Sequence, residues 1–262
     1  MNTTSRPRWV LSLLLATSVS VLNPLAIATS EAAPQPSIAT KATLMARRWG
    51  FRFRVRSSRY RRGGFARAGA GCPTANLTPL TPTIGSEGED LGDQAPSYLT
   101  AADHPTFFVH VPPLPATKGK LTLSRPDLPL MQQSIYETEF DLNGQAGIVG
   151  IQIPESAPAL EMGATYLWQV SVDCNPDDAR FLGYAAQGGM VERVADTAGT
   201  TSERLVFYGN EGIWQDALAL LAQQSYQAPT NAASHEDLAS LLDEAGLDAI
   251  AHAPVVQMVT GQ

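Results

Sequence analysis

Between residues 72 and 196, apolar and polar positions alternate in short runs. Six of these runs are rich in β-branched and aromatic residues and are bounded by Pro, Gly, Asn or Asp: 105–111, 119–124, 134–140, 147–153, 165–173 and 188–194. This composition is typical of β-strands, and 77–84 is a candidate for one more. Strands of this number and spacing predict a β-sandwich over 72–196. Asn143-Gly144, between two of the runs, is a typical pair for a hairpin turn.

The segment before the run at 165–173 carries the spacing L-x-x-G-x-x-Y, formed by Leu160, Gly163 and Tyr166. This spacing is typical of the tyrosine corner, in which the Tyr hydroxyl bonds to the backbone upstream. Trp168 lies on the same strand face as Tyr166, so both rings are predicted to be buried structural residues. The alternative role for these rings is an aromatic sugar-binding platform. The pattern predicts an immunoglobulin/fibronectin-III-like β-sandwich, followed by the helices described next.

The pattern changes to a helical period over residues 197–247. Apolar residues recur at i, i+3, i+4 and i+7 from Trp214 to Leu221, and again from Leu238. Ser234 is the candidate N-cap of the second helix, and Gly246 marks its end. We therefore expect a C-terminal helical hairpin that packs on the sandwich. The tail over 248–262 receives no assignment from its pattern.

The first helical unit resembles half of a tetratricopeptide repeat, because Tyr208, Gly212, Trp214 and Pro229 follow that motif's spacing. Such repeats need about three copies to bury a continuous core, and the sequence contains no second copy. Gly212 and Trp214 are predicted to be structural. The helices either cover one side of the sandwich or form a docking surface for a partner helix.

The first 28 residues have the layout of a secretory signal peptide. Arg6 and Arg8 precede a 14-residue apolar run, Trp9–Leu22, and Ala26-Ile27-Ala28 is a small-x-small cleavage site. An uncleaved membrane anchor is the alternative, but spanning a bilayer takes about 20 residues. We therefore expect a cleaved leader and a mature chain in the periplasm or outside the cell.

Charge divides the rest of the chain into a basic arm and an acidic body. Residues 41–71 hold ten basic and no acidic residues, whereas 72–262 hold six basic and 24 acidic residues. Like-charge repulsion predicts a disordered arm over 29–71, although the alternation in 51–57 is typical of a strand. The arginines expected to contact an anionic partner are Arg47, Arg48, Arg52, Arg54, Arg56, Arg59, Arg61, Arg62 and Arg67.

The two cysteines, Cys72 and Cys174, are predicted to form a disulfide. In the oxidising compartment expected for an exported chain, a pair of cysteines tends to join. The bridge would close a loop of about 100 residues, which the chain-entropy model values at roughly 4–5 kcal/mol. Two cysteines without C-x-x-C spacing indicate neither a zinc site nor a redox motif.

Motifs that carry reaction chemistry are absent from the sequence. The four histidines are not in a metal-ligand spacing, and the G-x-S-x-G, P-loop and G-x-G-x-x-G patterns do not occur. The acidic turn at 173–180 lacks the turn glycine and the bidentate glutamate of a calcium loop. The segment 85–93 is interpreted as a solvated acidic loop. We predict no catalytic, cofactor-binding or metal-ligating residue, and no cofactor.

Taken in order, seven segments resemble the cyanobacterial "domain of unknown function 928" family. They are Cys72-Pro73 with LTPL (77–80), PTFFVHVP (105–112), GIVGIQIP (147–154), YLWQVSVDC (166–174), GGMVERV (188–194), YGNEGIWQDAL (208–218) and LLDEAGL (241–247). The resemblance covers residues 72–247. It implies an exported protein with a sandwich followed by helices, and it implies no activity.

These observations predict a non-enzymatic interaction or structural module of the periplasm or cell envelope, peripheral to a membrane at most. Its expected partner is an envelope protein or an anionic polysaccharide or lipid, bound through the basic arm. A carboxylate-dependent hydrolase acting on cell-wall or polysaccharide substrates is the alternative. The arm's composition also suits nucleic acid, but export and the acidic body argue against that partner. The charges also permit the arm to dock on its own acidic body.

Overall fold

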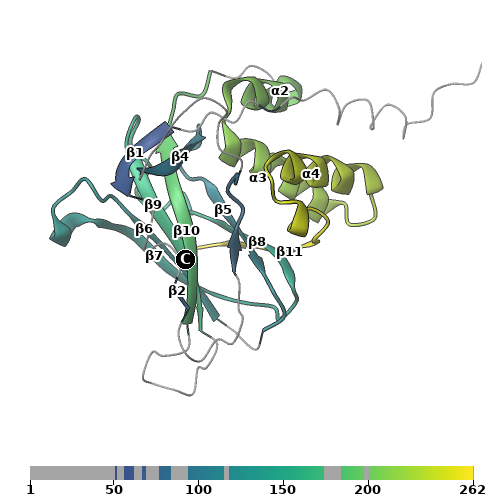
Figure 1. Cartoon of the computed structure of the whole chain (residues 1–262), viewed down its shortest axis with the longest axis horizontal. Coiled ribbons are helices and arrows are strands. Elements are labelled where there is room, and N and C mark those ends of the chain that lie inside the picture. Colours follow the sequence, from purple (N-terminus) through teal and green to yellow (C-terminus); the bar gives the residue numbers. More distant parts are fainter. Residues whose placement is uncertain are drawn as a thin grey trace, which may run out of the picture. The chain divides into compact units, whose positions relative to one another are not determined.

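A computed structural model describes residues 51, 56–61, 67–68, 77–83, 94–114, 118–173, 184–197 and 201–261 (Figure 1). These residues form two β-sheets and a group of α-helices near the C-terminus. A mainly β architecture with C-terminal helices is therefore confirmed. The predicted signal peptide, the segment 85–93 and both cysteines lie outside the described residues.

The larger sheet, called sheet A here, contains seven strands. They are β1 (Arg56–Arg61), β2 (Arg67–Ala68), β4 (Gln94–Thr100), β6 (Lys118–Ser124), β7 (Ser134–Asp141), β9 (Thr165–Asp173) and β10 (Tyr184–Arg193). Neighbouring strands follow the order β1-β4-β10-β9-β6-β7, and β2 also pairs with β10. The pairing of β4 with β10 is parallel, and the other pairings in the sheet are antiparallel.

The smaller sheet, sheet B, contains four strands in the order β11-β8-β5-β3. They are β3 (Thr78–Pro79), β5 (Thr106–Val111), β8 (Gly147–Gln152) and β11 (Val255–Thr260). Strand β11 pairs in parallel with β8, whereas β5 pairs antiparallel with both β8 and β3. The tail, which the sequence pattern leaves unassigned, therefore supplies a strand of sheet B.

Side chains from both sheets meet in one apolar core, which makes the two sheets a sandwich. Trp168 of β9 stacks on Phe107 of β5, with ring centroids 4.9 Å apart. Tyr166, Val170 and Val172 share that buried face of β9. The alternation of side chains along a strand therefore places these residues as predicted.

The helices are α2 (Thr201–Glu211), α3 (Trp214–Gln227) and α4 (Ala232–Glu244), with short 3-10 turns η1 (Leu130–Gln132) and η2 (Asp248–Ile250). Helices α3 and α4 form the predicted hairpin, and α3 contacts β4, β5 and β11. The N-cap prediction at Ser234 is wrong. Asn231 caps α4, because its side-chain oxygen accepts the N–H of Ala233.

The hairpin predicted at Asn143-Gly144 is also wrong. The turn joins β7 to β8, but β7 belongs to sheet A and β8 to sheet B. The chain crosses between the sheets here, and the Asn143 side-chain amide donates to the carbonyl of Val256 at 2.9 Å. A turn-forming dipeptide specifies a local reversal, and tertiary contacts decide which strands flank it.

The arm predicted to be disordered contributes two strands, so the prediction fails at these residues. Strand β1 pairs antiparallel with β4, opposite Ser97 and Pro96, and β2 pairs with the first part of β10. A register shift interrupts β1 after Ser57. Backbone pairing with strands of sheet A orders this part of the arm. The prediction from charge did not include this pairing.

Candidate functional site

Several loops meet at one end of sheet A, and the strand registers show which loops they are. Ser124 at the end of β6 is paired with Leu167, near the start of β9. The last residues of β10 lie opposite Thr165 and beside the end of β4. The hairpin 125–133 and the loop 155–164 therefore leave the same end of the sheet, which we call the loop end.

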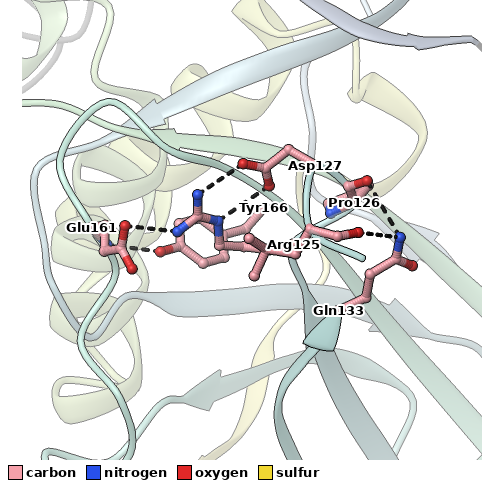
Figure 2. A network of polar contacts seen from close by, with 7 residues as sticks. Arg125, Pro126, Asp127, Gln133, Glu161 and Tyr166 are labelled. Carbon is pink, nitrogen blue, oxygen red and sulfur yellow. Dashed lines mark hydrogen bonds and ion pairs between the residues drawn. The ribbon is translucent and has the colours of Figure 1, made fainter. Parts of the chain in front are cut away.

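Arg125 is the centre of the polar network at the loop end (Figure 2). Its Nε and Nη2 atoms donate to the two carboxylate oxygens of Asp127 at 3.2 and 2.8 Å. Its Nη1 lies 2.7 Å from Oε2 of Glu161, and its guanidinium lies over the Tyr166 ring, 5.7 Å from the centroid. The hydrogen bond with Asp127, together with that of Glu161, raises the pKa of Arg125, although burial opposes the shift. Arg125 is therefore a fixed cation that joins two loops.

The hairpin 125–133 is closed across its base by Gln133. The Gln133 side-chain amide donates to the carbonyl of Leu128 at 2.9 Å. It also donates to the carbonyl of Pro126 at 3.4 Å, as Figure 2 shows. The backbone N–H of Arg125 donates to the Gln133 carbonyl at 2.8 Å. These bonds hold the turn in one conformation, and the tip of that turn presents apolar side chains to solvent.

The loop 155–164 is held by the predicted tyrosine corner. The Tyr166 hydroxyl accepts the backbone N–H of Glu161 at 2.7 Å, and Leu160 is buried. Gly163 has φ of +71°, a left-handed conformation that a residue with a Cβ adopts only at a cost. These three residues together fix the conformation of the loop 155–164.

Two further side chains fasten the same loop to the body. Nε2 of His104 lies 3.0 Å from the carbonyl oxygen of Ala157, and a guanidinium nitrogen of Arg193 donates to the carbonyl of Leu160. His104 also pairs with Asp103 at 3.2 Å. Slight burial works to raise the pKa of Asp103, but the His104 hydrogen bond and charge outweigh it and lower the pKa. His104 is thus a loop-fastening residue.

The helices are joined to the sheets by a second polar junction. Asp216 in the first turn of α3 accepts from the Thr100 hydroxyl at 2.8 Å and from the Ala101 N–H at 2.9 Å. Burial of the carboxylate raises its pKa, and these donated bonds oppose that shift. Trp214, which is buried, donates its indole N–H to the carbonyl of Leu80 at 2.9 Å. Gly212 connects α2 to α3 with φ of +68°, a left-handed conformation that favours glycine.

Phe51 belongs to the arginine-rich segment, which is the part of the basic arm from Arg47 to Arg67. It packs into the apolar core formed by the helices. Its side chain is only 7% exposed, and its ring meets Trp214 edge-on at a centroid distance of 5.8 Å. Its backbone N–H donates to a carboxylate oxygen of Glu244 at 3.3 Å. Docking on the chain's own acidic body, which the charges permit, is therefore observed at this residue.

The predicted anion-contacting arginines divide into two groups. Arg56, Arg59 and Arg61 belong to β1, and Arg67 belongs to β2. The others, Arg47, Arg48, Arg52, Arg54 and Arg62, lie outside the described residues. Cys72 and Cys174 lie there too, so their disulfide stays a prediction.

Catalytic geometry is sparse in the part of the chain that the structure describes. It holds no group of three or more His, Cys, Asp or Glu side chains suited to a metal ion. Asp127 and Glu161 come close together, but Arg125 occupies the space between them. Ser225 lies 2.7 Å from Nδ1 of His235, yet Ser225 is buried and closed to substrate. Among the described helices, none is long and apolar enough to cross a membrane.

Sequence reasoning missed the Arg125 network and the apolar tip of its hairpin. The network joins residues 36 positions apart, and a sequence without alignment gives no sign of such a pairing. The tip did have a signal, because Leu128, Leu130 and Met131 stand in a Pro-rich turn between two strands. Apolar side chains in a turn are expected either to fold back on the core or to meet a partner.

Comparison with known proteins gives one family match. A family model described as "Domain of Unknown Function (DUF928)" matches residues 60–255. This range includes all three described helices and most strands of both sheets; it begins inside β1 and ends at the first residue of β11. No curated protein matches the chain.

Proposed function

The chain belongs to the DUF928 family, and on that premise we propose that it is a non-enzymatic interaction module of the cell envelope. In this proposal, the arginine-rich segment binds an anionic envelope component. The signal peptide layout of residues 1–28 supports export to the periplasm or the cell exterior. The tyrosine-corner hydrogen bond of Tyr166 supports the finer assignment to an immunoglobulin/fibronectin-III-like sandwich. The resemblance of the seven sequence segments supports a cyanobacterial origin of the family.

One observation carries the binding proposal: Arg56–Arg61 and Arg67–Ala68 of the arginine-rich segment are strands of sheet A. Strand β1 has the sequence RSSRYR and forms the outer strand beside β4. Phe51 anchors the chain just before it. A charged segment held in this way loses less conformational entropy on binding than a free tail does. The segment is therefore a positioned cationic edge.

The rest of the chain directs an anion to that edge. Residues 72–262 carry 24 acidic against six basic residues, so they repel a polyanion. Several of the six are already engaged: Lys118 pairs with Asp141 at 3.2 Å, and Lys120 pairs with Glu137 at 2.5 Å. Binding of an anionic component through the arginine-rich segment is the arrangement with the least repulsion.

Co-sedimentation of the exported chain with isolated envelope membranes tests the proposal. The variant carries Arg56→Gln, Arg59→Gln and Arg61→Gln, which remove charge from β1 and keep side chains of similar length. We expect the variant to bind less at low salt and to show a weaker salt dependence between about 50 and 500 mM.

A matched control carries Lys118→Gln and Lys120→Gln, which remove charge from β6 in the same sheet. We expect this control to lose less binding than the β1 variant, because its lysines lie on β6, across the sheet from β1, and act on an anion only through the overall charge. Equal loss in both variants would show a general charge effect. Unchanged binding of the β1 variant would refute a role for the arginine-rich segment.

A further inference from the structure

The loop end of sheet A presents an unusual group of apolar side chains. Leu130 is 85% exposed, Met131 is 97% exposed, and Met162 is 56% exposed. These are three of the five large apolar side chains exposed among the described residues. The first two stand at the tip of the hairpin 125–133, and Met162 belongs to the neighbouring loop. Together we call them the apolar tip.

The structure holds the apolar tip outward. Arg125 links its two loops, since it bonds Asp127 in one and Glu161 in the other. Gln133 closes the hairpin beneath Leu130 and Met131. Leu and Met side chains fixed away from the core lose favourable burial, so this arrangement indicates a surface made for contact.

The charge beside the apolar tip is almost balanced. Asp127 and Glu161 each face the Arg125 guanidinium, as Figure 2 shows. The three groups together carry one net negative charge, which is small against the cationic charge of the segment 51–61. An anionic surface that attracts this segment is therefore repelled only weakly at the tip.

The strand registers place the start of β1, in the arginine-rich segment, level with the loop end of sheet A. Strand β1 runs antiparallel to β4: Arg56 at its start lies opposite Ser97 in the middle of β4, and Arg61 lies opposite Gln94, farther from the loop end. Ser97 pairs with Met190 of β10. Met190 lies opposite Leu167 of β9, and Leu167 pairs with Ser124 at the end of β6. Four strand spacings of about 4.8 Å separate β1 from β6, so the two features lie roughly 20 Å apart across the sheet.

We propose that the loop end of sheet A docks on an anionic lipid surface, with the apolar tip inserted among the headgroups and the start of the basic strand β1 lying on them. This inference rests on the proposed function and names its anionic component. A polysaccharide offers charge but no apolar phase for Leu130, Met131 and Met162. One weak apolar anchor and one basic segment together give the two signals that stable membrane attachment requires.

Flotation with vesicles of phosphatidylcholine, with and without phosphatidylglycerol, tests this inference on the chain isolated after export. The tip variant carries Leu130→Ser and Met131→Ser, and its matched control carries Tyr226→Ser, at an exposed position near the end of α3. Mass spectrometry of the N-terminus establishes that all chains compared carry the same leader state. We expect the tip variant to bind phosphatidylglycerol vesicles at least about tenfold more weakly than the parent. The control should bind like the parent, and all chains should bind pure phosphatidylcholine poorly.

Binding to alginate, an anionic polysaccharide without an apolar phase, separates this inference from the proposed function. We expect the tip variant to bind alginate like the parent, and the β1 variant to bind both alginate and vesicles more weakly. A tip variant that binds the vesicles as well as the parent overturns the lipid inference and leaves the proposed function intact. A β1 variant unchanged on both ligands overturns the proposed function. Thermal unfolding of each variant verifies that it is folded.

A second variant tests whether the tip must be held rigidly. Arg125→Ala removes the link between the two loops and leaves the apolar side chains in place. We expect weaker binding to phosphatidylglycerol vesicles and unchanged binding to alginate. Retained vesicle binding would contradict the requirement for a preorganised tip.

Discussion

The ring of Phe51 meets the indole of Trp214 edge-on, with 5.8 Å between centroids. This contact joins the arginine-rich segment to the core formed by the helices. Strand β1 begins five residues later and completes the edge of sheet A beside β4. The segment is therefore anchored at Phe51 and again along β1.

Phe51→Ala tests the first of these anchors. The substitution removes a nearly buried ring and its edge-to-face contact, so we expect the free energy of unfolding to fall by about 2–4 kcal/mol. Urea denaturation measures the change. Phe51→Leu is the conservative variant, because leucine keeps most of the apolar volume that the alanine substitution removes. A Phe51→Ala chain as stable as the parent would show that the ring does not dock.

Tyr166→Phe tests the tyrosine corner. The variant keeps the buried ring and removes the hydroxyl that accepts the Glu161 N–H at 2.7 Å. We expect a loss of about 1–3 kcal/mol in unfolding free energy, because a partly buried donor is left without its acceptor. Tyr226→Phe, at an exposed position, is the matched control and should cost little. If the two substitutions lowered the free energy of unfolding equally, the Tyr166 hydroxyl would not stabilise the tyrosine corner.

Asp216 makes the stability of the fold depend on pH. Because burial raises the pKa of Asp216 in the folded chain, the fold favours its protonated form. Its contribution to stability is present below the unfolded pKa of about 4 and is lost as pH rises through the higher folded pKa. Asp216→Asn keeps an acceptor for Thr100 and Ala101 and does not titrate. We therefore expect the variant to lose less stability than the parent as pH rises from about 4.

Urea denaturation across this pH range measures the difference between the two chains. Asp248→Asn, at an exposed position in η2, is the matched control and should follow the parent. Parallel pH profiles for Asp216→Asn and the parent would contradict a raised pKa at Asp216.

The strands with regular alternation could be predicted from the sequence, because burial on one face of a sandwich imposes that period. The run at 165–173 corresponds to β9, and its alternate residues, including Tyr166 and Trp168, lie in the core as expected. The helical period from Trp214 likewise corresponds to α3. In both elements, the apolar residues that create the periodic pattern along the chain are the ones buried in the core.

Other elements depend on partners that a local pattern does not contain. Strand β4 includes Pro96, which is unfavourable in a strand, and it forms between β1 and β10. Strand β11 pairs with β8, which lies about 100 residues earlier. Asn143-Gly144 forms a turn, but the strand before it, β7, belongs to sheet A and the strand after it, β8, belongs to sheet B.

The candidate site was predictable only in part. The tyrosine corner follows from the spacing of Leu160, Gly163 and Tyr166 along the chain. The link from Arg125 to Glu161 does not, because it requires the hairpin 125–133 and the loop 155–164 to leave sheet A side by side. The arginine-rich segment was recognised by its charge, and its place in the sheet was visible only in the structure.

Amide hydrogen exchange across residues 51–61 tests most directly whether β1 of the arginine-rich segment is a fixed part of sheet A. Hydrogen bonding to β4 slows exchange in a paired strand, whereas a free tether exchanges like an unstructured peptide. We predict that amides within β1 exchange at least about tenfold more slowly than the unstructured rate, and more quickly than those of the central strand β9. Exchange of β1 at the unstructured rate would contradict a fixed cationic edge.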